Sequence, residues 1–137
     1  MGRIVGLDFG RVRTGIATTD EMQLIASGLT TVPTTELLSF LKKFVAEEKV
    51  TSFVVGEPRQ MNNMPSESEA IIGPFVEVLK KTFPDIPVHR QDERFTSQMA
   101  VKSMVASGMK KKNRRDKKMV DEISATLILQ GYLERIK

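Results

Sequence analysis

Residues 3–19, RIVGLDFGRVRTGIATT, decide the fold class of this chain. The stretch opens with an apolar run that is interrupted by Asp8, and such a run is typical of a buried strand. A turn marked by glycines follows at 10–15, and two further β-rich runs occupy 15–19 and 25–32. Because the connections between these runs are short, the three strands are predicted to form an antiparallel meander.

Helices and strands alternate in the rest of the chain. Thr34 or Thr35 is predicted to cap a helix after Pro33, and the apolar segment 51–56 and the segment 86–91 are predicted strands. The other predicted helices run from Ser66, with a kink or restart at Gly73-Pro74, from Thr96 or Ser97 to Gly108, and from about Met119 to Ile136. This order predicts an α/β fold with a mixed five-stranded sheet, antiparallel in its first three strands and flanked by helices.

The composition is that of one globular domain spanning residues 1–137. Of all residues, 40% are hydrophobic, and no apolar run approaches the roughly 20 residues that a membrane-spanning helix requires. The N-terminus leads directly into a predicted strand and has no signal-peptide pattern. The chain contains no cysteine, which fits a reducing compartment. These features predict a cytoplasmic protein without a membrane partner.

The basic residues are concentrated in one segment. Lysine and arginine number 21 against 17 acidic residues, and seven of the nine residues 110–118 (KKKNRRDKK) are basic. Clustered cations gain affinity for nucleic acid by releasing counterions, although a solvated surface loop accounts for the cluster equally well. The candidate phosphate-binding residues are Arg11 and Arg13 of the first turn and Lys110, Lys111, Lys112, Arg114, Arg115, Lys117 and Lys118 of the cluster.

Several kinds of catalytic site are excluded by what the chain lacks. With one histidine, His89, and no cysteine, neither a cysteine–histidine pair nor a multi-histidine zinc site can form. His89 lies within a predicted strand, where a structural role is favoured over that of a general base. Catalysis by a serine–histidine–aspartate triad is disfavoured for the same reason.

The remaining candidates for catalysis are carboxylates, and several of them lie at the ends of predicted strands, where functional residues of a sheet are commonly found. Asp8 interrupts the first strand, where an unpaired buried charge is costly. Glu57 follows the fourth strand, Asp92 and Glu93 end the fifth, and Asp121 lies in the first turns of the last helix. Oxygen ligands are those that Mg²⁺ prefers, and two such ions can activate water for phosphodiester cleavage. Each carboxylate could instead serve as a helix cap or a surface ion-pair partner.

Four ordered motifs together resemble the YqgF/RuvX family, which is described as pre-16S rRNA nucleases or Holliday junction resolvases. They are GLDFGRVRTGIA at 6–17, VVGEPRQMNN at 54–63, DERFTS at 92–97 and VDEISATLILQGYL at 120–133. The resemblance extends nearly end to end. It implies a ribonuclease-H-like fold and a nuclease that depends on a divalent metal, Mg²⁺ or Mn²⁺.

The resemblance also implies roles for individual residues. Asp8, Glu93 and Asp121 are carried over as catalytic metal ligands, and Asp92 is a further candidate from the same motif as Glu93. Glu57 departs from the commoner family pattern, which has an apolar residue there, so it is either an additional ligand or a variant of the loop. The implied partner is nucleic acid, with 5′-end maturation of pre-16S rRNA favoured over resolution of branched DNA.

Two other classes of protein remain as alternatives. The ATPases of the actin and sugar-kinase class have a similar first motif, but they close two domains around ATP and this chain has room for one. An RNA-binding module without turnover would keep the basic segment but would not require Asp8, Glu93 and Asp121. The chain is expected to be a monomer or a homodimer, and junction resolution would favour a symmetric dimer because two related strands are cut.

Overall fold

The computed structural model describes residues 2–57, 69–92 and 117–136, and within them one sheet with helices on both faces. The elements, in chain order, are β1 (Arg3–Asp8), β2 (Arg13–Thr19), β3 (Ala26–Pro33), the 3₁₀ turn η1 (Thr34–Glu36), α1 (Leu37–Glu47), β4 (Val50–Glu57), α2 (Glu69–Thr82), β5 (Val88–Asp92) and α5 (Lys117–Ile136). The helix predicted from Thr96 or Ser97 to Gly108 lies outside the described residues.

The described strands are arranged in the order β3-β2-β1-β4-β5. β1 pairs antiparallel with β2, and β2 pairs antiparallel with β3, whereas β4 and β5 continue the sheet in parallel with β1. The predicted mixed sheet, antiparallel in its first three strands, is therefore confirmed. The fifth strand begins at Val88, later than predicted, because Ile86 still bonds back to Phe83 in the preceding turn.

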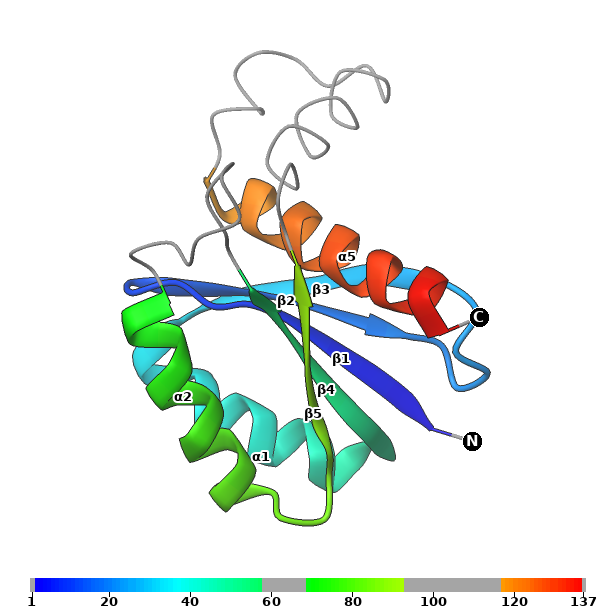
Figure 1. Cartoon of the computed structure of the whole chain (residues 1–137), viewed down its shortest axis with the longest axis horizontal. Coiled ribbons are helices and arrows are strands. Elements are labelled where there is room, and N and C mark those ends of the chain that lie inside the picture. The colour runs from blue at the N-terminus through cyan, green and yellow to red at the C-terminus, as the bar shows by residue number, and fades with distance from the viewer. Residues whose placement is uncertain (1, 58–68, 93–116, 137) are drawn as a thin grey trace.

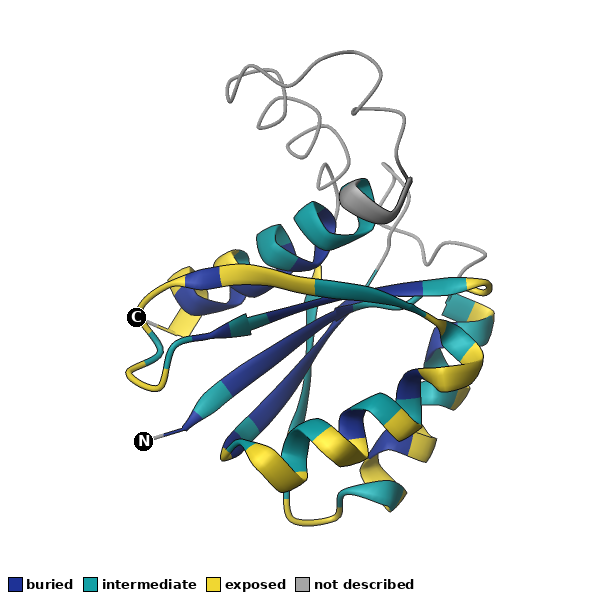
Figure 2. Cartoon of the chain, turned by 180° about the vertical axis from the view of Figure 1, so that it is seen from behind, coloured by how far each residue is buried: buried dark blue, intermediate teal, exposed yellow. Residues whose placement is uncertain are grey.

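Helices cover the sheet in two layers. Figure 1 shows α1 and α2 on one face and α5 crossing the other. The core under α1 and α2 includes Leu7, Leu41, Phe53, Val55, Ile72 and Leu79. The core under α5 includes Ile4, Ala17, Val54, Ile128 and Leu129. Figure 2 shows that β1 and β4 are buried along most of their length, as the apolar run of the fourth strand predicted, whereas the edge strand β3 is largely exposed.

α5 lies very close to the strands beneath it because those strands present small residues. A Cβ built on Gly6 of β1 would lie 2.9 Å from Cβ of Leu129. On β3, the corresponding atom of Gly28 would lie 3.3 Å from Oγ1 of Thr126. Larger residues at these positions would push the helix away from the sheet. None of the helices in the described part of the chain combines the length and apolar character that a membrane crossing needs.

The predicted cap of the first helix is wrong, and one of the two alternatives for the second helix, a restart at Pro74, is excluded. After Pro33 the chain forms the turn η1, and α1 begins at Leu37 with no side-chain cap hydrogen bond. The Thr34 hydroxyl, predicted as a cap, instead donates to the carbonyl of Gly10 at 2.6 Å. α2 does not restart at Pro74 but continues through it. Pro74 is exposed, so water can hydrate the carbonyl that the proline leaves without a donor.

Candidate active site

Three acidic residues end neighbouring parallel strands of the sheet. Asp8 is the last residue of β1, and the preceding Leu7 lies level with Val55 of β4. Glu57 and Asp92 end β4 and β5 and lie opposite each other in the register of these strands. The structure thus places three of the predicted carboxylates at the carboxyl edge of the parallel strands, where sites form in open α/β sheets.

The pleat of the strands divides these carboxylates between the two faces of the sheet. Gly6 lies against α5, with its built Cβ 2.9 Å from Leu129, and Asp8 follows two residues later on the same strand. Val55 packs in the core under α1 and α2, and Glu57 follows two residues after it. Because side chains alternate between faces, Asp8 falls on the α5 face and Glu57 on the opposite one.

Asp121 meets the first strands at Gly15. Asp8 and Gly15 lie opposite each other across β1 and β2, and a Cβ built on Gly15 would lie 2.1 Å from the backbone oxygen of Asp121. The beginning of α5 therefore rests directly on the strand beside Asp8. The pKa of Asp8 is raised to about 7, first by burial and then by the negative charge of Asp121. A cation between these two carboxylates would relieve both effects.

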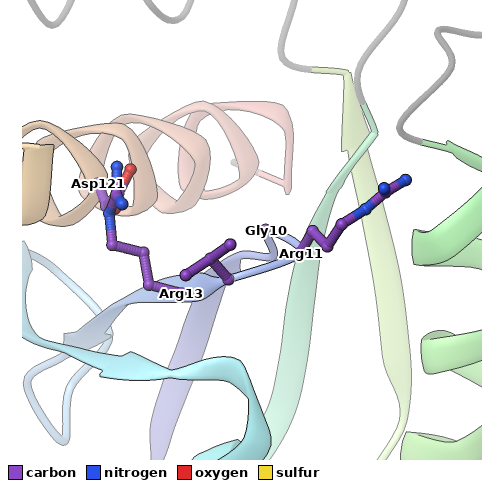
Figure 3. A pocket seen from close by; sticks show the side chains of 5 residues that line it. Gly10, Arg11, Arg13 and Asp121 are labelled. Carbon is purple, nitrogen blue, oxygen red and sulfur yellow. The ribbon is translucent and has the colours of Figure 1, made fainter.

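Arg13 provides a positive charge beside Asp121. Its Nε lies 2.5 Å from Oδ2 of Asp121, joining the start of β2 to the first turns of α5. Figure 3 shows the Arg13 side chain directed at Asp121, while Arg11 extends away from it. Arg11 is exposed. The two arginines predicted to bind phosphate are therefore in different surroundings: Arg13 contacts Asp121, and Arg11 points away from it.

The turn between β1 and β2 forms the wall of an open hollow of about 250 Å³. The hollow is lined by Gly10, Arg11, Val12, Arg13 and Asp121. The side chain of Val12 is 72% exposed, so the turn presents its apolar residue outward as well as its arginines. An open hollow lined by two arginines is suited to hold a phosphate group.

Thr34 anchors this turn from outside it. Its backbone N–H donates to the carbonyl of Val12 at 2.9 Å, and its hydroxyl donates to that of Gly10 at 2.6 Å. The same hydroxyl lies 3.0 Å from Oγ1 of the buried Thr14. Sequence reasoning missed this role because a threonine after a proline also fits a helix cap. Thr34 thus positions the residues that line the hollow.

Replacing Thr34 with valine is expected to lower the free energy of unfolding by about 1–2 kcal/mol, because it leaves the Gly10 carbonyl and the Thr14 hydroxyl short of a partner. Urea denaturation measures the change. Thr35→Val is the matched control, since Thr35 is exposed and should change stability by less than about 0.5 kcal/mol. Equal effects of the two substitutions would contradict the anchoring role.

Arg90 is a second residue that sequence reasoning missed. Its guanidinium donates to both carboxylate oxygens of Glu69, at 2.7 and 2.9 Å, and to the carbonyls of Val55 and Gly56. Ser66, where the sequence predicts this helix to begin, lies outside the described residues. Arg90 ties the start of α2 to the end of β4, next to Glu57. The sequence around Arg90 does not indicate this role, because its partners lie on other elements.

Of the remaining predicted residues, some lie within the described part of the chain and others outside it. His89 stacks on Tyr132 of α5 with ring centroids 5.3 Å apart, which fits the structural role predicted for it. Within residues 2–57, 69–92 and 117–136, no three histidine, aspartate or glutamate side chains are close enough to hold a metal ion. The backbones of Lys117 and Lys118 belong to α5. The predicted residues outside the described ones are Glu93, Lys110, Lys111, Lys112, Arg114 and Arg115.

Known proteins resemble this chain over nearly its whole length. Residues 2–135 match the family model described as "RuvX: Holliday junction resolvase". A protein of Bacteroides thetaiotaomicron, named "Putative pre-16S rRNA nuclease", is 58% identical over 134 residues, which cover 98% of this chain and 97% of the relative. Matches of this extent show that the chain shares a family with these proteins.

Solved structures resemble the fold at much lower identity. Thermus thermophilus RuvC in complex with a Holliday junction substrate has a TM-score of 0.60 and 14% identity, covering 98% of this chain and 96% of RuvC. Fowlpox virus resolvase with Holliday junction DNA has a TM-score of 0.62 and 12% identity, covering 98% of both chains. These likenesses concern the fold alone and confirm the predicted ribonuclease-H-like architecture. With this fold, and with a family model that matches residues 2–135, the chain belongs to the RuvX family.

Proposed function

We propose that this protein is a metal-dependent nuclease that hydrolyses phosphodiester bonds in pre-16S rRNA, in the cytoplasm. The observation that carries the proposal is the pairing of Asp8 with Asp121 across Gly15, at the rim of an open hollow that contains Arg13. The name of the Bacteroides relative, at 58% identity, supports the substrate. The family description supports the class of reaction.

The chemistry of the two carboxylates fits a divalent cation. Both offer oxygen donors, which Mg²⁺ and Mn²⁺ prefer, and the burial that raises the pKa of Asp8 would be offset by a bound cation. Asp8 and Asp121 would hold the ion on the α5 face, with Glu93 completing the set. Glu57 and its register partner Asp92 end their strands on the other face and are therefore weaker candidates than the sequence suggested. When bound, such ions activate the attacking water and stabilise the leaving oxygen.

The other residues of the site have roles that need no metal. Arg13 and Arg11 lie at the hollow and would bind the phosphate groups on either side of the scissile bond. The basic segment 110–118 would hold the nucleic-acid backbone further away, through contacts that weaken as salt rises. Thr34 and Gly15 would keep the turn and the start of α5 in register with Asp8.

Resolution of Holliday junctions is the second candidate function. The family description names this activity, and the structures of RuvC and of the fowlpox virus resolvase contain junction DNA. A binding module without turnover is less well supported. Burial and the charge of Asp121 raise the pKa of Asp8 to about 7, and placing a carboxylate there does not by itself improve the binding of nucleic acid.

Cleavage assays on two substrates test the proposal. A labelled pre-16S rRNA 5′ leader and a four-way DNA junction are incubated side by side with the protein and Mg²⁺ or Mn²⁺, with EDTA as the control. We expect the RNA to be cut in the presence of the metal and to stay intact in EDTA. Cleavage of the junction alone would select the resolvase. Binding of either substrate without cleavage in the presence of either metal would contradict the nuclease and favour a binding module without turnover.

A further inference from the structure

The ion pair between Arg13 and Asp121 is shorter than the Arg90–Glu69 and Arg3–Glu48 ion pairs. Nε of Arg13 and Oδ2 of Asp121 are 2.5 Å apart, whereas the Arg90–Glu69 pair measures 2.7 Å and the Arg3–Glu48 pair 3.3 Å. The two side chains are only partly covered, with 32% and 21% of their surfaces exposed. An ion pair with this much access to water can exchange its partners.

The ion pair is not needed to hold α5 on the sheet. The backbone of Asp121 already rests on Gly15, at a distance that leaves no room for a Cβ. Leu129 and Ala125 make similar close contact with Gly6 one strand further along. These contacts locate the start of the helix by packing. The Arg13 guanidinium is therefore available for a role other than fixing the helix.

Arg13 and a divalent cation would compete for the same carboxylate. A guanidinium in contact with Oδ2 of Asp121 occupies one oxygen that a cation would use, and its positive charge would repel a cation placed between Asp8 and Asp121. Arg13 also lines the open hollow of about 250 Å³, so its guanidinium has space to move into once it leaves the carboxylate. Its planar fork of donors matches two oxygens of a phosphate.

We propose that Arg13 is a positioning residue that holds Asp121 in the metal-free protein, releases it to a divalent cation, and then binds a substrate phosphate in the hollow. The exchange would keep the carboxylate oriented before metal binding and would couple metal binding to substrate binding. This inference rests on the proposed nuclease function, because it requires Asp121 to be a metal ligand.

Calorimetric titration of the metal-free, full-length protein with Mn²⁺ tests the competition. We expect Arg13→Gln to lower the Kd for Mn²⁺ by about threefold to tenfold, because the competing charge is removed. Arg13→Lys should give an intermediate Kd, since it keeps the charge but loses the planar fork. Arg11→Gln is the matched control and should leave the Kd unchanged, since Arg11 extends away from Asp121. Circular dichroism checks that each variant is folded.

Fluorescence anisotropy with a labelled RNA 5′ leader tests the second half of the exchange. Mn²⁺ should strengthen RNA binding by the wild-type protein at least about threefold more than binding by Arg13→Gln, because only the wild type has a guanidinium to release. The integrity of the RNA is checked on a gel after each titration. Because the wild type is expected to cut the natural RNA in Mn²⁺, the labelled leader is synthesised with cleavage-resistant linkages, which makes this readout independent of turnover.

The outcomes separate this inference from the proposed function. An equal Kd for Mn²⁺ in the wild type, Arg13→Gln and Arg13→Lys would overturn the exchange and leave the nuclease proposal standing. A lower thermal stability of Arg13→Gln without a change in Kd would make the ion pair purely structural and would also overturn it. Absence of Mn²⁺ binding by the wild type would overturn both proposals.

Discussion

Asp8→Asn is expected to reduce metal-dependent cleavage by about 10²–10³-fold or more, because it removes a charge that would act on the metal ion in the transition state. The substitution keeps the shape of the side chain, so the sheet and α5 should stay in place. Initial rates on the preferred substrate, with saturating Mn²⁺, measure the loss. Asp85→Asn is the matched control, since Asp85 is exposed in the turn before β5. A full cleavage rate in Asp8→Asn would exclude Asp8 from the reaction.

The same substitution is expected to stabilise the metal-free protein at high pH. Burial and Asp121 raise the pKa of Asp8 from 3.8 to about 7 in the folded state. Below pH 4 both states hold the proton, but between about pH 4 and pH 7 the unfolded chain loses it first. The free energy of unfolding of the wild type therefore falls as pH rises through this window, by up to about 4 kcal/mol.

Urea denaturation of the wild type and Asp8→Asn in EDTA, at pH 4.5 and at pH 8, measures this effect. Asp8→Asn should be the more stable protein at pH 8, and its advantage should shrink markedly at pH 4.5. Addition of Mn²⁺ at pH 8 should raise the unfolding free energy of the wild type more than that of Asp8→Asn, because the ion offsets the buried charge. An advantage that does not change with pH would show that Asp8 ionises normally in the folded protein.

Gly15→Ala is expected to cost about 3 kcal/mol of unfolding free energy and to remove most of the activity. Its Cβ would lie 2.1 Å from the Asp121 carbonyl oxygen and 2.4 Å from the carbonyl carbon, so the start of α5 has to move. Asp121 moves with it. A displacement of about 1 Å in a catalytic group is enough to cost roughly a hundredfold in rate.

Thermal denaturation and cleavage rates at a temperature where the variant is folded separate the two effects. Gly73→Ala is the matched control, because the nearest atom to its Cβ would be 4.0 Å away. It should stay within about 1 kcal/mol of the wild type, since the helix favours alanine while Pro74 disfavours it. Wild-type stability and activity in Gly15→Ala would mean that α5 does not depend on this contact.

Most of the fold could be predicted from local pattern. The run RIVGLDF and the segment TSFVVG are apolar without helical spacing, and both proved to be buried central strands. The short connections to the second and third strands led to the antiparallel meander. Capping was predicted less well, because a threonine after Pro33 suits both a helix cap and the loop anchor that Thr34 proved to be.

The site could be predicted only as a set of residue types. A carboxylate inside an apolar strand marks Asp8 as unusual without any knowledge of its neighbours. The strand ends likewise mark Glu57 and Asp92, but the pleat decides that Glu57 falls on the face opposite to Asp8. The alternation of side chains along a strand can be predicted from the sequence. Which helix covers each face of the sheet cannot, because it depends on the tertiary structure.

The sequence by itself determined the order of the elements, the mixed sheet and the presence of a carboxylate in the first strand, because hydrophobic period and turn residues act over a few positions. Only the tertiary structure decided that Arg13 pairs with Asp121, 108 positions away, and that Arg90 clamps Glu69. Those contacts depend on where α5 and α2 cross the sheet. α5 can approach β2 closely at Gly15 because glycine has no side chain. The need for a glycine at this position becomes visible only when the position of α5 is known.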